Sequence, residues 1–153
     1  MQKKFDAWGI KGHDGVDFGL PEGTEVVAVD AGTVSQYGEN GDFGISVTIK
    51  HEWGISLYAH LHDTAITLHQ NIKEGEVIGH SGQTGVTTGP HLHFGIKPND
   101  EVLENGYLGF VDPTPGFVKA RQFKVIKRQQ TLEREGKIRQ KGIRGRSVYT
   151  PVQ

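Results

Sequence analysis

The chain of 153 residues contains no cysteine. This absence excludes a disulfide framework and a thiolate metal site, so a bound metal ion would need His, Asp or Glu ligands. The sequence also has no apolar run long enough to span a membrane. Its N-terminal stretch "MQKKFDAWGIKGHDG" lacks the uninterrupted apolar segment of a signal peptide. We therefore expect no membrane span and no signal peptide in this chain.

Basic residues are scarce in the first part of the chain. Residues 1–118 hold 6 Lys and Arg against 16 Asp and Glu, whereas residues 119–153 hold 11 against 2. The change falls near "DPTPGF", and it predicts an acidic domain over 1–118 followed by a basic tail over 119–153. Within the tail, the window 127–141 favours a helix, although Gly136 weakens it.

The basic tail has two interpretations. One is a solvated linker or arm, and the other is an electrostatic contact with an anionic polymer or a virion protein. We predict no specific nucleic-acid partner.

Helical periodicity is missing from residues 1–118, and the 22 glycines of the full chain indicate many tight turns. Strand-like runs at 24–30, 31–38 and 44–61 are separated by Gly, Asn and Asp, as in a sandwich or barrel. The length suits one domain with a core of its own. We predict an all-β domain. The similarity of "PEGTEVVA" (21–28) to "KEGEVIG" (73–79) further suggests a duplicated half-motif, although any turn that enters a strand looks similar.

Two histidines stand one residue apart in "TTGPHLHFGI", residues 87–96. In an extended strand, residues i and i+2 share a face, so His91 and His93 should project together while Leu92 and Phe94 point into the core. A lone His-x-His is a weak signal, and its meaning depends on partners elsewhere in the chain.

A second cluster, "GHDGVDFG" at 12–19, places His13 four residues before Asp17. Its glycines argue against a helix, so both side chains should lie on one side of an extended segment. Together with one histidine of the HLH pair, they would make an N/N/O ligand set with an open fourth position, which is typical of hydrolytic zinc.

A third cluster is "SLYAHLH", residues 56–62. Strict alternation predicts that Leu57, Ala59 and Leu61 point inward, whereas Tyr58, His60 and His62 point outward. An imidazole near a metal can accept a proton or stabilise an oxyanion. The residues alone therefore lead to a metallohydrolase.

The order of these motifs, HxGxD, then YAHL, then glycine-rich turns and GPHLHF, resembles the zinc peptidoglycan endopeptidases of the lysostaphin and LytM type, the M23 peptidases. The resemblance runs from about residue 8 to residue 97, and "NGYLGFVDPTPGF" is similar to the segment that closes such domains. It implies an antiparallel β sandwich of duplicated hybrid-motif type. Carried over by position, the Zn²⁺ ligands are His13, Asp17 and His93, and the catalytic histidines are His60 and His91.

The resemblance also implies a substrate and a place of action. The substrate would be a peptide bond in peptidoglycan, in a stem peptide or a cross-bridge, which places the protein outside the cell at the cell wall or on a phage tail. The chain departs from the family at Gly95, where Glu is common, and at His62, where a small residue is usual. We interpret His62 as an exposed residue, and His51, His69 and His80 as structural or solvent-facing.

Three alternatives stay open at this point. A catalytically silent relative would bind the wall or activate other wall enzymes. A virion structural module would use zinc only for stability. A histidine phosphocarrier of similar fold would not need the ligands His13 and Asp17.

Overall fold

In this computed structural model, residues 11–100 and 103–115 are described. The chain divides into two units, 1–114 and 115–153, and all the elements named below lie in the first. The predicted tail 119–153, with its helix over 127–141, lies outside the described residues and stays a prediction. The described elements are β1 (Val16–Phe18), β2 (Glu25–Val27), β3 (Gly32–Glu39), η1 (Gly41–Phe43), β4 (Ile45–Lys50), β5 (Gly54–Asp63), β6 (Asn71–Ile72), β7 (Val77–Ser81), β8 (Leu92–Pro98) and η2 (Leu103–Asn105).

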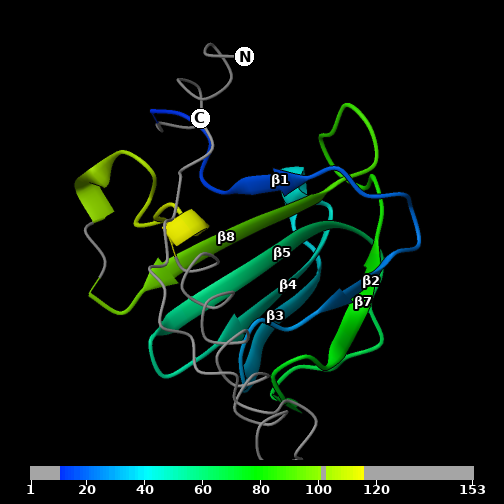
Figure 1. The fold of residues 1–153 in the computed structure, drawn as a ribbon, viewed down its shortest axis with the longest axis horizontal. Helices are drawn as coiled ribbons and strands as arrows, with labels where there is room; N and C mark the ends of the chain where they lie inside the picture. Colours follow the sequence, from blue (N-terminus) through cyan, green and yellow to red (C-terminus); the bar gives the residue numbers. More distant parts are fainter. Residues whose placement is uncertain (1–10, 101–102, 116–153) are drawn as a thin grey trace, which may run out of the picture. The chain divides into compact units, whose positions relative to one another are not determined.

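The strands form an antiparallel fold around one main sheet (Figure 1). Its order is β1-β8-β5-β4-β3-β6. β7 pairs with the C-terminal end of β5 and also with β2. Every pairing between the named strands is antiparallel. The prediction of an all-β antiparallel fold is confirmed.

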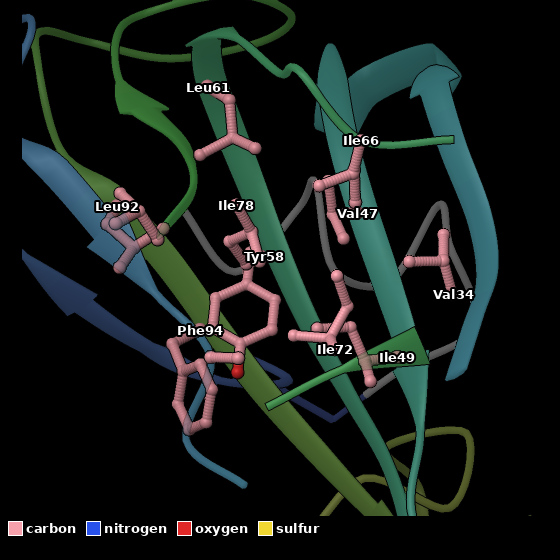
Figure 2. Packing of buried hydrophobic residues seen from close by; sticks show 12 residues of the cluster. Val34, Val47, Ile49, Tyr58, Leu61, Ile66, Ile72, Ile78, Leu92 and Phe94 are labelled. Atoms are coloured by element: carbon pink, nitrogen blue, oxygen red, sulfur yellow. The ribbon is translucent and has the colours of Figure 1, made fainter. Parts of the chain in front are cut away.

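The core lies between the main sheet and the β2–β7 pair. β-branched and leucine side chains from both sets of strands make one buried cluster, together with Tyr58 and Phe94 (Figure 2). Leu92 and Phe94 belong to this cluster, as the alternation around the HLH pair predicts. The opposite face of β8 is thereby left for polar side chains.

The two similar segments 21–28 and 73–79 pair with each other along β2 and β7. Their turns repeat the same main-chain hydrogen bonds: Gly23 N–H donates to Ser81 O at 2.8 Å, and Gly75 N–H donates to Ala28 O at 2.8 Å. Both glycines have positive φ, 83° and 78°, which favours glycine. The similarity in sequence therefore corresponds to a local two-fold repeat in the hydrogen bonding.

β5 does not keep the predicted alternation along its whole length. Tyr58 is 1% exposed and packs in the core cluster, so the prediction that it points outward is wrong. Ala59 is opposite His93 in the ladder, which puts it on the polar face of β8. His60 then adopts a left-handed backbone conformation with φ of 58°, after which Leu61 returns to the core. This single residue resets the alternation, because its backbone leaves the strand region.

A buried chain of polar groups ties Tyr58 to its neighbours. Val29 N–H donates to Tyr58 Oη at 2.9 Å, and Tyr58 Oη lies 3.2 Å from Ser56 Oγ. Ser56 Oγ is 2.7 Å from His51 Nε2, and His51 Nδ1 lies 2.8 Å from Ala31 O. Since the carbonyl of Ala31 only accepts, Nδ1 of His51 carries the proton and Nε2 accepts from Ser56. His51 is thus a structural residue, as the sequence suggests.

Candidate functional site

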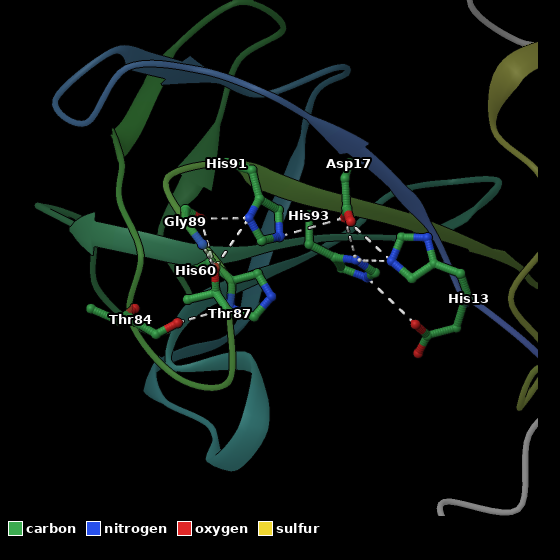
Figure 3. Close-up of polar contacts among 9 residues, drawn as sticks. His13, Asp17, His60, Thr84, Thr87, Gly89, His91 and His93 are labelled. Atoms are coloured by element: carbon green, nitrogen blue, oxygen red, sulfur yellow. Dashed lines mark hydrogen bonds and ion pairs between the residues drawn. The ribbon is translucent and has the colours of Figure 1, made fainter. Parts of the chain in front are cut away.

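The register of two strands builds the centre of the site. In the β1–β8 ladder Asp17 is directly opposite His93, so both side chains project from the same face. His13 lies just before β1 and reaches the same point. The Nδ1 atom of His93 is 3.0 Å from His13 Nε2 and 3.2 Å from Asp17 Oδ1, as Figure 3 shows. Segments 80 and 76 residues apart in sequence therefore converge here.

These three atoms form a nearly equilateral triangle. Its sides are 3.0, 3.2 and 3.3 Å, the last between His13 Nε2 and Asp17 Oδ1. Ligands at about 2.0–2.1 Å from a tetrahedral zinc ion are separated from one another by roughly 3.3–3.4 Å. The triangle therefore has nearly the size of one face of a zinc coordination tetrahedron. The residues present fit a metal ion with two nitrogen ligands and one oxygen ligand.

The other ring nitrogen of His93 points the opposite way. His93 is 3% exposed, and its Nε2 is buried without a hydrogen-bond partner in the described part of the chain. Asp14 Oδ1 lies 3.6 Å from it. His13, Asp14 and His93 can also each offer one ligand atom within 4.8 Å of the others, so Asp14 is a second carboxylate at this centre.

His60 reaches the site from β5. Its Nδ1 lies 2.8 Å from the main-chain oxygen of Thr84. Because a carbonyl oxygen can only accept, Nδ1 carries the proton of the neutral ring and Nε2 is left with its lone pair. The Thr84 hydroxyl donates to Leu61 O at 2.6 Å and accepts from Ile45 N–H at 2.9 Å, which holds the loop around Thr84 in place.

His91 is held in the same way. Its Nδ1 lies 2.8 Å from Gly89 O, so Nδ1 again carries the proton. The Thr87 hydroxyl, 3.2 Å from the same nitrogen, donates to Gly89 O at 2.6 Å. The free Nε2 of His91 lies 3.7 Å from Asp17 Oδ1. The ring centroids of His60 and His91 are 4.7 Å apart, so two imidazoles lie beside the three candidate ligands.

Burial favours the neutral forms of His60 and His93. Desolvation lowers the pKa of His60 below its ordinary value of 6.5, and the nearby imidazole of His91 lowers it further, against the opposing effects of the hydrogen bond that His60 Nδ1–H donates to Thr84 O and of the charge of Asp17. Desolvation likewise lowers the pKa of His93, against the opposing charge of Asp14. Neutral imidazole is the form that binds metal or accepts a proton.

Two close contacts fix the ring of His93. A Cβ atom on Gly15 would lie 2.7 Å from His93 Cε1 and 2.8 Å from Nε2, so only glycine leaves room for the ring. On another side, the ring of Phe43 packs with its centroid 5.5 Å from that of His93. Packing therefore requires glycine between His13 and Asp17.

The structure brings together all the predicted site residues. His13, Asp17 and His93 surround one point, with His60 and His91 next to it (Figure 3). The side chain of His62 is 56% exposed and lies 2.7 Å from Glu22, in agreement with its interpretation as an exposed residue. Sequence reasoning missed Asp14, although its position inside the HxGxD motif was a signal, and it missed the carbonyls of Thr84 and Gly89, which no side-chain pattern reveals.

Comparison with known proteins gives consistent results. The model of peptidase family M23 matches residues 11–105. The DD-carboxypeptidase/endopeptidase Mpg of Neisseria meningitidis serogroup B is 39% identical over 110 residues, which are 71% of this chain and 25% of that protein. The peptidoglycan DD-endopeptidase ShyC of Vibrio cholerae is 37% identical over 101 residues, covering 62% of this chain and 23% of that protein.

A solved structure shows the same fold. The catalytic domain of the antimicrobial peptidase lysostaphin from Staphylococcus simulans superposes with a TM-score of 0.64 at 27% identity, over 78% of this chain and 98% of that one. The chain spans about a quarter of the length of the curated relatives named above. Among the described residues, no helix has the length and apolar character needed to cross a membrane.

Proposed function

The chain belongs to peptidase family M23, and from this premise we propose that it is a zinc-dependent endopeptidase that cleaves peptide bonds in bacterial peptidoglycan. The observation that carries the proposal is the triangle of His13 Nε2, Asp17 Oδ1 and His93 Nδ1, with sides of 3.0 to 3.3 Å. It combines a ligand geometry suited to zinc with two neutral imidazoles at its edge.

In this proposal His13, Asp17 and His93 hold Zn²⁺. When bound, zinc polarises a carbonyl group and lowers the pKa of water toward 7, which gives a nucleophile at neutral pH. Asp17 provides a negative charge that offsets part of the charge of the ion, and the two rings bind as neutral ligands.

His60 and His91 handle the proton and the developing negative charge. Their Nδ1 protons are committed to the carbonyls of Thr84 and Gly89, so each presents an Nε2 lone pair to the site. One ring accepts the proton of the attacking water. In its protonated form, that ring can then donate a hydrogen bond to the tetrahedral oxyanion or to the leaving amine. The lowered pKa of His60 keeps this ring neutral and ready to accept at pH 7.

The peptidoglycan substrate is proposed from the relatives. ShyC is named a peptidoglycan DD-endopeptidase, and Mpg a DD-carboxypeptidase/endopeptidase. We propose that this chain acts on stem peptides or cross-bridges of the wall. It would therefore act outside the cytoplasm, either at the bacterial cell wall or as part of a phage tail.

The test is digestion of purified cell walls of known cross-bridge type, followed by mass analysis of the new peptide termini. We expect cleavage that stops with a chelator and returns with zinc. The variant His93→Ala should lose both zinc and cleavage, whereas His91→Ala should keep zinc and lose cleavage. Wild-type chain that binds zinc but leaves every wall type intact would refute the enzyme and favour a silent wall-binding or activator module.

A further inference from the structure

We propose that Asp14 is a positioning residue, whose carboxylate accepts a hydrogen bond from Nε2–H of His93 and so aims Nδ1 of the same ring at the metal. This inference rests on the proposed function, because it assigns His93 as a metal ligand. Asp14, His93 and the metal ion would then form a carboxylate–histidine–metal triad.

The geometry of His93 requires a partner for Nε2. If Nδ1 binds the metal, the proton of the neutral ring must sit on Nε2. That nitrogen is buried without a hydrogen-bond partner in the described part of the chain, and a buried N–H without an acceptor is destabilising because its desolvation is not offset. Asp14 Oδ1 lies 3.6 Å away, which is a few tenths of an ångström beyond hydrogen-bonding range. Because packing fixes the ring of His93, a small rotation of the Asp14 side chain is required to close the contact.

Asp14 is held where it can serve this role. Its side chain is only 11% exposed. Gly95 has no Cβ atom; a Cβ there would lie 3.1 Å from the main-chain oxygen of Asp14 and 2.9 Å from the ring of Phe110. Gly95 therefore lets the segment of Asp14 pack closely against β8 beside His93. A buried carboxylate facing a ring N–H also increases the electron density on the opposite nitrogen, which strengthens it as a ligand.

The same contacts argue against Asp14 as a ligand in place of Asp17. The edge of the His93 ring that carries Nε2 packs against Gly15 so tightly that a single Cβ would lie 2.8 Å from Nε2. That space cannot hold an ion with open positions for water and substrate. The Nδ1 edge faces Asp17 and His13 at ligand-to-ligand distances. The two carboxylates therefore act on opposite nitrogens of one ring.

The test measures zinc affinity of the full chain after metal removal, by competition with a chromophoric chelator. Asp14→Ala should weaken zinc binding about 10-fold to 100-fold, and Asp14→Asn, which keeps an acceptor oxygen but no charge, should weaken it less. Asp17→Ala serves as the reference for a lost ligand. Asp42→Asn is the matched control: Asp42 is an exposed carboxylate next to Phe43, whose ring packs on His93, and its loss should leave the affinity unchanged.

Spectroscopy separates positioning from ligation and from general destabilisation. With Co²⁺ in place of zinc, Asp14→Asn should keep the tetrahedral absorption spectrum of the wild type, and its nitrogen-edited NMR spectrum should show the Nε2 proton of His93 shifted from the wild-type position. Wild-type affinity in Asp14→Ala would overturn the proposal. So would an affinity loss equal to that of Asp17→Ala with a changed Co²⁺ spectrum, since Asp14 would then be a ligand.

Failure of the proposed function gives a different result. A wild-type chain that binds zinc and shows the graded Asp14 series, but cuts no peptidoglycan, would keep the positioning role and refute the peptidase. A wild-type chain that cuts peptidoglycan while Asp14→Ala binds zinc normally would do the reverse. A wild-type chain that binds no zinc overturns both.

Discussion

Replacement of Gly15 by alanine tests how closely packing controls the metal centre. The added Cβ would lie 2.6 Å from Phe94 O and 2.7 Å from His93 Cε1. One of these neighbours is main chain in β8 and the other is the ring of a proposed ligand, so neither yields without disturbing the site. Forcing extra volume into a packed position typically costs about 1–3 kcal/mol.

Part of this strain should appear as lost zinc affinity. If the ring of His93 moves out of the ligand triangle, a cost of 1–3 kcal/mol corresponds to a dissociation constant for zinc that is roughly 5-fold to 150-fold larger. If β1 separates from β8 instead, the cost appears as a lower melting temperature of the metal-free chain, by roughly 3–5 °C per kcal/mol for a domain of this size. The assays are chelator competition for zinc and thermal unfolding followed by circular dichroism.

Gly19→Ala is the matched control. Gly19 lies as far after Asp17 as Gly15 lies before it, and a Cβ there meets nothing within 4 Å. We expect this variant to keep the zinc affinity and melting temperature of the wild type within error. The reasoning would be refuted if Gly15→Ala matched Gly19→Ala in both measurements, because the close contacts at Gly15 would then carry no energy.

The acid side of the pH range should affect both activity and stability. The pKa of His60 and of His93 is lowered in the folded chain. As the pH falls below about 6.5, the unfolded chain therefore binds more protons than the folded chain, which lowers the free energy of unfolding. The metal-free protein should melt at a lower temperature at pH 5.5 than at pH 7.5. His60→Asn, which tolerates the left-handed backbone, should reduce this dependence, and an unchanged slope would contradict the assignment. Peptidase activity should likewise fall below about pH 6 as the histidine ligands become protonated, and a flat profile from pH 5 to 8 would count against the proposed mechanism. In the core, Tyr58→Phe should lower the free energy of unfolding by about 1–3 kcal/mol, because it removes the acceptor of Val29 N–H. Its zinc affinity should not change. The control Tyr37→Phe, at an exposed position, should leave the melting temperature unchanged.

The sequence predicts most of the fold class because its signals are local. Alternation around the HLH pair correctly assigns Leu92 and Phe94 to the core, and the absence of helical periodicity correctly indicates strands. The convergence of Asp17 with His93 follows from a long-range register, which the spacing of residues within one segment does not contain. The order of the motifs supplied that information through the family resemblance.

Residues 58–61 show where local reasoning fails. Strict alternation put Tyr58 and His60 on one face, but Tyr58 lies in the core and only His60 turns to the site. The cause is the left-handed backbone at His60, with φ of 58°, which is uncommon outside glycine and costs energy that the surrounding contacts must offset. A pattern of side-chain types carries no sign of such a residue.

The acceptors that orient His60 and His91 are main-chain oxygens, of Thr84 and Gly89. Every amino acid brings the same oxygen to its position, so no exchange of a single side chain can delete either acceptor. The loops around this site can therefore change in composition while each imidazole keeps a main-chain acceptor for its Nδ1 proton.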